Sequence, residues 1–128
     1  MIAPIWILKE TVLALQEQLI AEFGGETGLR DMGLLESALA RPKHVHTYRE
    51  ASIIDLAASY AFGLVKNHPF IDGNKRIGFT VAATFLEING HTFTAAEVDA
   101  VIQTLALAAG ELDEAGYAAW LAANSQAG

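Results

Sequence analysis

The sequence contains no cysteine among its 128 residues. This absence excludes disulfide bonds, thiol catalysis and zinc sites built on cysteine, and it agrees with a reducing, cytoplasmic environment. Basic residues are also scarce, because 8 Lys and Arg stand against 15 Asp and Glu, for a net charge of -7. A chain of this sign lacks the broad basic surface that follows nucleic-acid phosphates, so direct nucleic-acid binding is not expected.

Long apolar runs are missing as well. The longest uncharged stretches, such as 56–65 and 77–86, have about half the ~20 apolar residues that a bilayer requires. The start, "MIAPIWILKE", lacks the basic segment of a secretory signal, so we expect a cytoplasmic protein with no membrane partner. With 52% apolar and 18% charged residues, the chain is rich enough in core-forming side chains to fold as one domain over 1–128.

Apolar spacing and helix-stop signals predict a compact all-α bundle of about six helices. No alternating pattern longer than "HTFT" suggests strands. The expected helices are 6–23 before two glycines, 31–42 with Asp31 as N-cap and Pro42 as terminator, 51–68 before Pro69, 74–88 before Asn89, 94–109 opened by a Thr94–Glu97 capping box, and 113–123. A polar connector is expected over 43–50.

One polar stretch, "NHPFIDGNKR" from Asn67 to Arg76, differs from its apolar surroundings. Gly73 lies just before a predicted helix, whose unpaired N–H groups and dipole favour an anion. Glycine would allow close approach of a phosphate and a positive φ. Lys75 and Arg76 oppose the helix dipole in the first turn unless a polyphosphate binds there. We therefore expect an active-site loop at a helix N-terminus.

The other side chains of this stretch supply the remaining chemistry. Asp72 beside a phosphate is a natural Mg²⁺ ligand, because magnesium is held by one or two carboxylates and nucleotide oxygens. Arg76 offers a fork for phosphate oxygens. His68 could deprotonate a hydroxyl, since imidazole titrates near neutrality. Phe70 is expected to anchor the loop to the core.

Simpler interpretations exist for several of these residues. His68 could end a helix, and Asn74 could cap the next one after an ordinary Asp-Gly turn. That account leaves Lys75 and Arg76 unexplained. A metal site formed by His44, His46 and His68 is an alternative to a solvated polar connector. Arg30 and Asp31 are expected to form a turn and a cap.

The stretch "HPFIDGNKR" resembles the signature of the Fic/Doc superfamily, His-x-Phe-x-Asp/Glu-Gly-Asn followed by positions that include an arginine. The flanking "GLRDMGLLESALARP", "LAASYAFGLVKNHPF" and "FLEING" resemble its Doc branch. The resemblance implies a compact helical bundle. It also implies His68 as general base, Asp72 as Mg²⁺ ligand and Arg76 as phosphate clamp, with Gly73, Asn74 and Lys75 forming the anion-binding segment.

Two departures from the AMP-transferring Fic pattern favour Doc. Lys75 stands where Fic enzymes usually have glycine, and Phe79 where they have a second arginine. Similarity to Doc, the death-on-curing toxins, implies a type II toxin that uses ATP and Mg²⁺ to phosphorylate a threonine of elongation factor Tu. The alternatives are Fic-type AMP transfer and a catalytically silent partner that modulates its antitoxin's repressor activity.

The chain also lacks the inhibitory helix motif of self-restrained Fic proteins, because no glutamate follows a Ser or Thr by four residues. Restraint is then expected from a Phd-like antitoxin, whose disordered C-terminal segment folds as a helix into a groove on the toxin.

Overall fold

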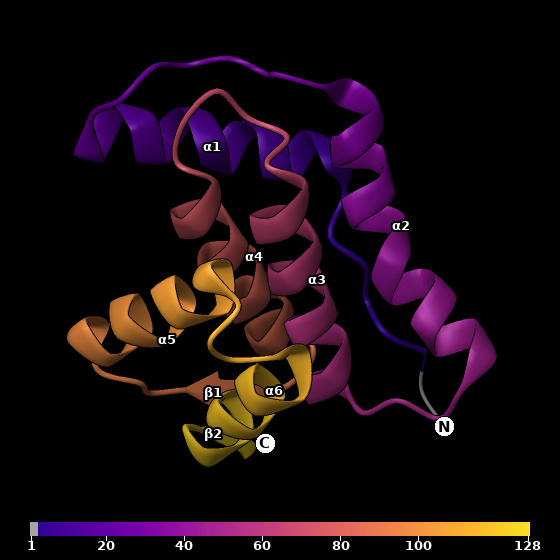
Figure 1. The fold of residues 1–128 in the computed structure, drawn as a ribbon. Helices are drawn as coiled ribbons and strands as arrows, with labels where there is room; N and C mark the ends of the chain where they lie inside the picture. Colours follow the sequence, from indigo (N-terminus) through magenta and orange to yellow (C-terminus); the bar gives the residue numbers. More distant parts are fainter. Residues whose placement is uncertain (1–2) are drawn as a thin grey trace.

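The computed structural model describes residues 3–128, which form six helices and two short strands (Figure 1). The predicted all-α fold is confirmed, and the strands add only one antiparallel pair. The helices are α1 (Lys9–Phe23), α2 (Met32–Tyr48), α3 (Ile53–Asn67), α4 (Asn74–Ile88), α5 (Glu97–Ala109) and α6 (Glu114–Ala123), and the strands are β1 (His91–Phe93) and β2 (Ser125–Ala127).

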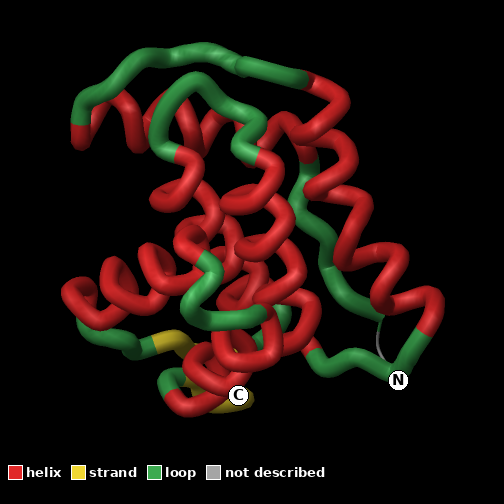
Figure 2. Tube along the Cα trace, in the orientation of Figure 1, coloured by secondary structure: helices red, strands yellow, loops and turns green. Residues whose placement is uncertain are grey.

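Helices α3 and α4 occupy the centre of the molecule (Figure 2). Helix α3 packs against α2, α4 and α6, and every residue from 56 to 61 is buried. Its first turn is closed by a capping box in which Ser52 accepts from the Asp55 N–H and Asp55 accepts from the Ser52 N–H. The nearly continuous apolar surface of α3 agrees with this central position.

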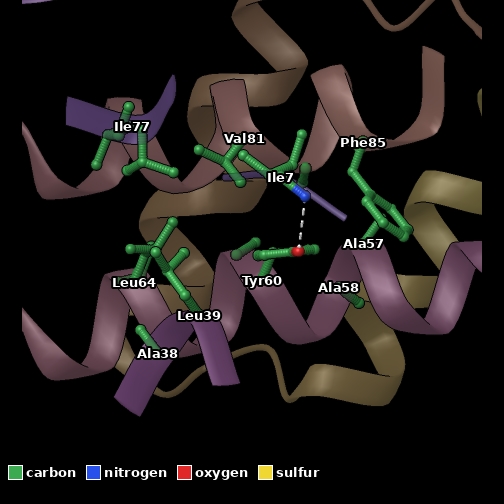
Figure 3. Packing of buried hydrophobic residues seen from close by; sticks show 14 of the residues in the cluster. Ile7, Ala38, Leu39, Ala57, Ala58, Tyr60, Leu64, Ile77, Val81 and Phe85 are labelled. Carbon is green, nitrogen blue, oxygen red and sulfur yellow. Dashed lines mark hydrogen bonds between the residues drawn. The ribbon is translucent and has the colours of Figure 1, made fainter. Parts of the chain in front are cut away.

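The core between α3 and α4 also receives the segment that precedes α1 (Figure 3). The Tyr60 hydroxyl accepts a hydrogen bond of 3.1 Å from the Ile7 N–H, and the Tyr60 ring lies 5.1 Å from that of Phe85. Burial raises the pKa of Tyr60 above its ordinary value. The N-terminal segment is thus fixed to the central helices, which orients α1 across their ends (Figure 1).

The predicted end of the second helix at Pro42 is wrong, and so is the polar connector after it. Helix α2 continues to Tyr48 through a buried Pro42. A proline removes one helical hydrogen bond and crowds the preceding turn, but packing on both sides of it compensates. Leu39 is buried one turn before, and His46 packs edge-on against Trp6 one turn after. Among the described residues, no three or more His, Asp or Glu side chains come together as a metal site, so the alternative of a three-histidine site is wrong.

The predicted capping box of the fifth helix does not form. Helix α5 begins at Glu97 with Ala96 as N-cap and without a side-chain cap. Thr94 donates its backbone N–H to the Asn124 carbonyl at 2.9 Å, next to the β1–β2 pair. Thr94 is therefore held next to the strand pair and does not act as the N-cap of helix α5, which was its predicted role.

None of the helices between residues 3 and 128 has the length and apolar character needed to cross a bilayer.

Candidate active site

The stretch from Asn67 to Arg76 joins the two central helices. Helix α3 ends at Asn67, and His68 follows with φ 53° and ψ 54°, the left-handed conformation typical of helix ends. Pro69 has no N–H to donate, and its ring disfavours the right-handed helical conformation for His68, so helix α3 ends here. Helix α4 begins at Asn74, as predicted, and the loop between the helices has His68 and Gly73 at its two ends.

Phe70 and Asn74 fix the shape of this loop. Phe70 is 1% exposed, in the interior position expected of an anchor. Its N–H donates to Asn74 Oδ1 at 2.9 Å, and its carbonyl accepts from Asn74 Nδ2 at 3.0 Å. The buried Asn74 amide therefore closes the loop, and the group that Asn74 can offer an anion is its backbone N–H.

Gly73 directly precedes helix α4 and is its N-cap residue. Its φ of 75° is a conformation that glycine adopts without steric cost. Within residues 3–128, the N–H groups of Asn74, Lys75 and Arg76 have no acceptor, and the first helical bond is from Ile77 to the Gly73 carbonyl. Three free amides and the positive end of the helix dipole make this turn suitable for a phosphate.

Asp72 lies beside these amides with its carboxylate exposed to solvent. One carboxylate oxygen accepts from the Gly73 N–H at 3.0 Å, and the other from the Glu26 N–H at 3.3 Å. The Asp72 backbone carbonyl accepts from Gln16 Nε2 at 2.6 Å, which ties the loop to α1. Carboxylate oxygens have further lone pairs, so Asp72 fits a Mg²⁺ ion that takes its other ligands from phosphate and water.

Two cations complete the site. Lys75 and Arg76 are exposed in the first turn of α4 and form no salt bridge within the described part of the chain. The Arg76 guanidinium lies 4.2 Å from the centre of the Phe23 ring, at the end of α1. This cation–π contact holds the guanidinium near the amides without neutralising it. An anion would relieve the conflict of both charges with the helix dipole.

All these groups open onto one cleft of about 510 Å³ between α1, α4 and α5. His68, Asp72, Lys75 and Arg76 line one part of it. The remaining wall is mainly apolar, with Leu19, Phe23, Phe79, Ala100, Val101 and Leu105 among its residues, and it also includes Thr80, Glu97 and Thr104. The cleft thus combines an anion-binding end with an apolar wall, the composition typical of sites for phosphorylated organic ligands.

The family model described as Fic/DOC family matches residues 6–86, which include the whole loop. The chain belongs to the Fic/DOC family. Toxin Doc of Mycolicibacterium smegmatis is 46% identical over 70 residues, 53% of this chain and 54% of that protein. Protein kinase doc of Escherichia phage P1 is 32% identical over 85 residues, 66% of this chain and 68% of that protein. The resemblance to the Doc branch is confirmed, although the match spans only about half the length of the mycobacterial relative.

One departure from the AMP-transferring Fic pattern, Phe79, packs against other aromatic side chains. Phe79, which stands at the position of the second Fic arginine, lies in the cleft wall. Its ring centre is 5.8 Å from that of Phe93 and 6.3 Å from that of Trp120. In this Fic/DOC protein, Phe79 therefore belongs to an aromatic cluster at the cleft wall.

Three contacts of the loop were missed by the sequence analysis. Gln16, which the sequence analysis did not single out, is buried under Asp72. A Cβ on Gly25 would lie 2.7 Å from Asp72 Oδ2, so that glycine allows the carboxylate to approach the turn after α1. Arg30, expected in a turn, donates to the carbonyls of Asn67 and His68. Each contact joins segments at least 37 residues apart, so no local pattern reveals it.

Proposed function

We propose that this Fic/DOC protein is the toxin of a type II toxin–antitoxin pair and transfers the γ-phosphoryl group of ATP to a threonine of elongation factor Tu. One observation carries the proposal: an imidazole, an exposed carboxylate, three free amides and two unpaired cations converge on one cleft. Phosphoryl transfer depends mainly on positioning and charge stabilisation, and these groups supply both. The proposed target belongs to the translation machinery, so we propose a cytoplasmic site of action.

His68 acts as the general base in this proposal. Its exposed imidazole takes the proton from the threonine hydroxyl as the hydroxyl oxygen attacks the γ-phosphorus. A new O–P bond forms, the bond between the γ-phosphorus and the β–γ bridging oxygen breaks, and ADP leaves with the electron pair. The amides of the first α4 turn and the Arg76 guanidinium stabilise the charge on the phosphate oxygens.

Asp72 is the residue that would hold Mg²⁺. The ion supplies charge neutralisation to the phosphates when it is bound. The carboxylate is already directed by the N–H groups of Gly73 and Glu26. This fixed orientation favours a ligand role, because little side-chain freedom remains to be lost on binding.

Phe79 and Lys75 favour phosphoryl transfer over AMP transfer. Phe79 occupies the position of the second Fic arginine with an apolar ring, and Lys75 fills the position of the Fic glycine with a cation in the cleft. Replacing Lys75 with glycine tests this assignment. Gain of AMP transfer would support a role for Lys75 in blocking the Fic orientation, and unchanged chemistry would count against it.

The partner proposed for this toxin is a Phd-like antitoxin whose helical segment lies on α5. Four large apolar side chains of this helix are 48–72% exposed and recur at the spacing of one helix face: Val98, Val101, Ile102 and Leu105. Val101 and Leu105 also line the cleft, so a helix bound there would lie next to the nucleotide site.

Expression of the protein in bacteria, compared with a His68→Ala variant, tests the catalytic proposal. Growth arrest by the wild type that disappears in the variant is the expected result, because removal of the base stops transfer. His68 is exposed, so the variant should fold normally, and its circular dichroism spectrum checks this. Equal growth arrest by both proteins would refute the catalytic role and favour a silent antitoxin-binding co-regulator.

A further inference from the structure

His68 is the one non-glycine residue with a positive φ within the described residues, at 53°. The left-handed conformation is unfavourable for a residue with a Cβ, and helices usually end with glycine or asparagine at such a position. A side chain persists in this conformation only where its surroundings fix it. The residue proposed as general base is therefore held in a backbone state that it would rarely choose by itself.

Arg30 contacts the backbone at this point. Its Nε donates to the His68 carbonyl at 2.7 Å, and its Nη2 donates to the Asn67 carbonyl at 3.0 Å. The last carbonyls of a helix have no partner within the helix, and a cation there also interacts favourably with the dipole. The planar guanidinium binds two successive carbonyls at once, which the single ammonium of lysine cannot reproduce with the same geometry.

The backbone around Arg30 is fixed to the same loop. The N–H groups of Arg30 and Asp31 donate to the Pro69 carbonyl at 2.7 and 3.0 Å, and the Ile71 N–H donates to the Gly28 carbonyl at 3.1 Å. Asp31 in turn caps α2 by accepting from the Leu34 N–H. The guanidinium is thus attached to a short pairing of segments 28–31 and 69–71, and it has little freedom to move away from His68.

Arg30 has no position in the anion-binding part of the site. It does not line the cleft, and it forms no salt bridge within residues 3–128. Its Nε and Nη2 are directed at backbone carbonyls, whereas Lys75 and Arg76 face the cleft and form no salt bridge within the described residues. A role in nucleotide binding is therefore not the explanation of its contacts.

We propose that Arg30 is the positioning residue that holds His68 in its left-handed conformation and so aims the imidazole into the cleft. The proposal rests on the proposed function, because it takes His68 to be the base. Arg30 touches neither nucleotide nor the reacting atoms, and it acts through the backbone carbonyls of Asn67 and His68. Its removal should slow chemistry while nucleotide binding persists.

The test compares three purified variants with the wild type: Arg30→Gln, Arg30→Lys and Lys9→Gln. Lys9 begins α1 and pairs with Glu36, so Lys9→Gln removes one positive charge away from the loop. The first readout needs no activity: the Cα chemical shift and amide exchange of His68 in NMR spectra. We expect both to change in Arg30→Gln, to change less in Arg30→Lys, and to match the wild type in Lys9→Gln.

The second readout is phosphoryl transfer. We expect Arg30→Gln to lower kcat by about 100-fold, the effect of a misplacement near 1 Å, with KM for ATP within about twofold of the wild type. Arg30→Lys should recover part of kcat. A rise in KM at constant kcat would overturn the proposal, and so would wild-type NMR signals for His68 in Arg30→Gln. If the NMR changes occur but the wild type transfers no phosphoryl group, the proposed function fails while the conformational role of Arg30 stands. If Arg30→Gln does not fold, the same comparison uses Arg30→Lys.

Discussion

The two adjacent glycines after α1 allow a direct test of how the Asp72 carboxylate is held. Gly24 and Gly25 both have positive φ, at 88° and 116°. A Cβ on Gly24 would meet nothing within 4 Å, whereas a Cβ on Gly25 would lie 2.7 Å from Asp72 Oδ2 and 3.1 Å from the Ile20 side chain. Alanine at Gly24 therefore introduces backbone strain alone, and alanine at Gly25 adds a collision with the proposed Mg²⁺ ligand.

The expected stability losses follow from this difference. The φ of 88° and ψ of 172° at Gly24 lie in a region that is almost exclusive to glycine, so alanine there costs about 1–3 kcal/mol, and the φ of 116° at Gly25 implies a similar cost. In Gly25→Ala the carboxylate must also move and lose its 3.3 Å hydrogen bond from the Glu26 N–H, and this adds at most about 1 kcal/mol because the group is exposed. The melting temperature should fall by about 4–12 °C for Gly24→Ala, and by about 4 °C more for Gly25→Ala than for Gly24→Ala.

Binding of Mg·ATP separates the two variants more clearly. Calorimetry should give Gly24→Ala the wild-type affinity and Gly25→Ala an affinity roughly tenfold weaker, or about 1.4 kcal/mol, because the carboxylate no longer faces the metal. Equal melting temperatures and equal affinities for the two variants would refute the assignment of Gly25 as the position that lets Asp72 approach the turn.

Three further predictions concern other parts of the site and core. Asn74→Ala leaves the buried N–H and carbonyl of Phe70 without partners, so urea unfolding should show a loss of about 3 kcal/mol; a loss below about 1 kcal/mol would contradict the closing role of Asn74. Asp72→Asn keeps the shape of the side chain but removes its charge, so calorimetry should show ATP binding that no longer depends on Mg²⁺; retained Mg²⁺ dependence would exclude Asp72 as the ligand. Burial raises the pKa of Tyr117 to about 12, and the unfolded chain loses this proton near the ordinary value of 10.0. The stabilisation of the folded state by the protonated Tyr117 hydroxyl is therefore complete below about pH 10, and about 2–3 kcal/mol of it is lost as the pH rises toward about 12. Unfolding at several alkaline pH values should show this fall in the free energy of unfolding, and Tyr117→Phe should show less of it.

The loop and the helices beside it could be predicted because their signals are local. Pro69 stops α3, and Asn89-Gly90 ends α4, so the sequence alone places the polar stretch between two helices. The continuation of α2 past Pro42 could not be predicted in this way. It depends on burial of Pro42 and on the Trp6–His46 contact, which are tertiary interactions.

The difference between local signals and tertiary interactions also separates the site residues from the residues that hold them in place. His68, Asp72 and Arg76 lie within nine consecutive residues, where their chemistry is visible as a pattern. Gln16 and Arg30 act on that pattern from segments that only the fold brings near. Both residues bind backbone carbonyls, and this kind of contact leaves no signature in residue type or spacing.

The central claim is that the cleft transfers a phosphoryl group to a protein hydroxyl, and intact-mass analysis tests it most directly. Purified elongation factor Tu would be incubated with the protein, Mg²⁺ and ATP, with His68→Ala as control. The account predicts a gain of about 80 Da, one phosphoryl group, with the wild type alone. A gain of one AMP would instead assign Fic-type transfer to the same residues, and an unchanged mass would contradict elongation factor Tu as the target.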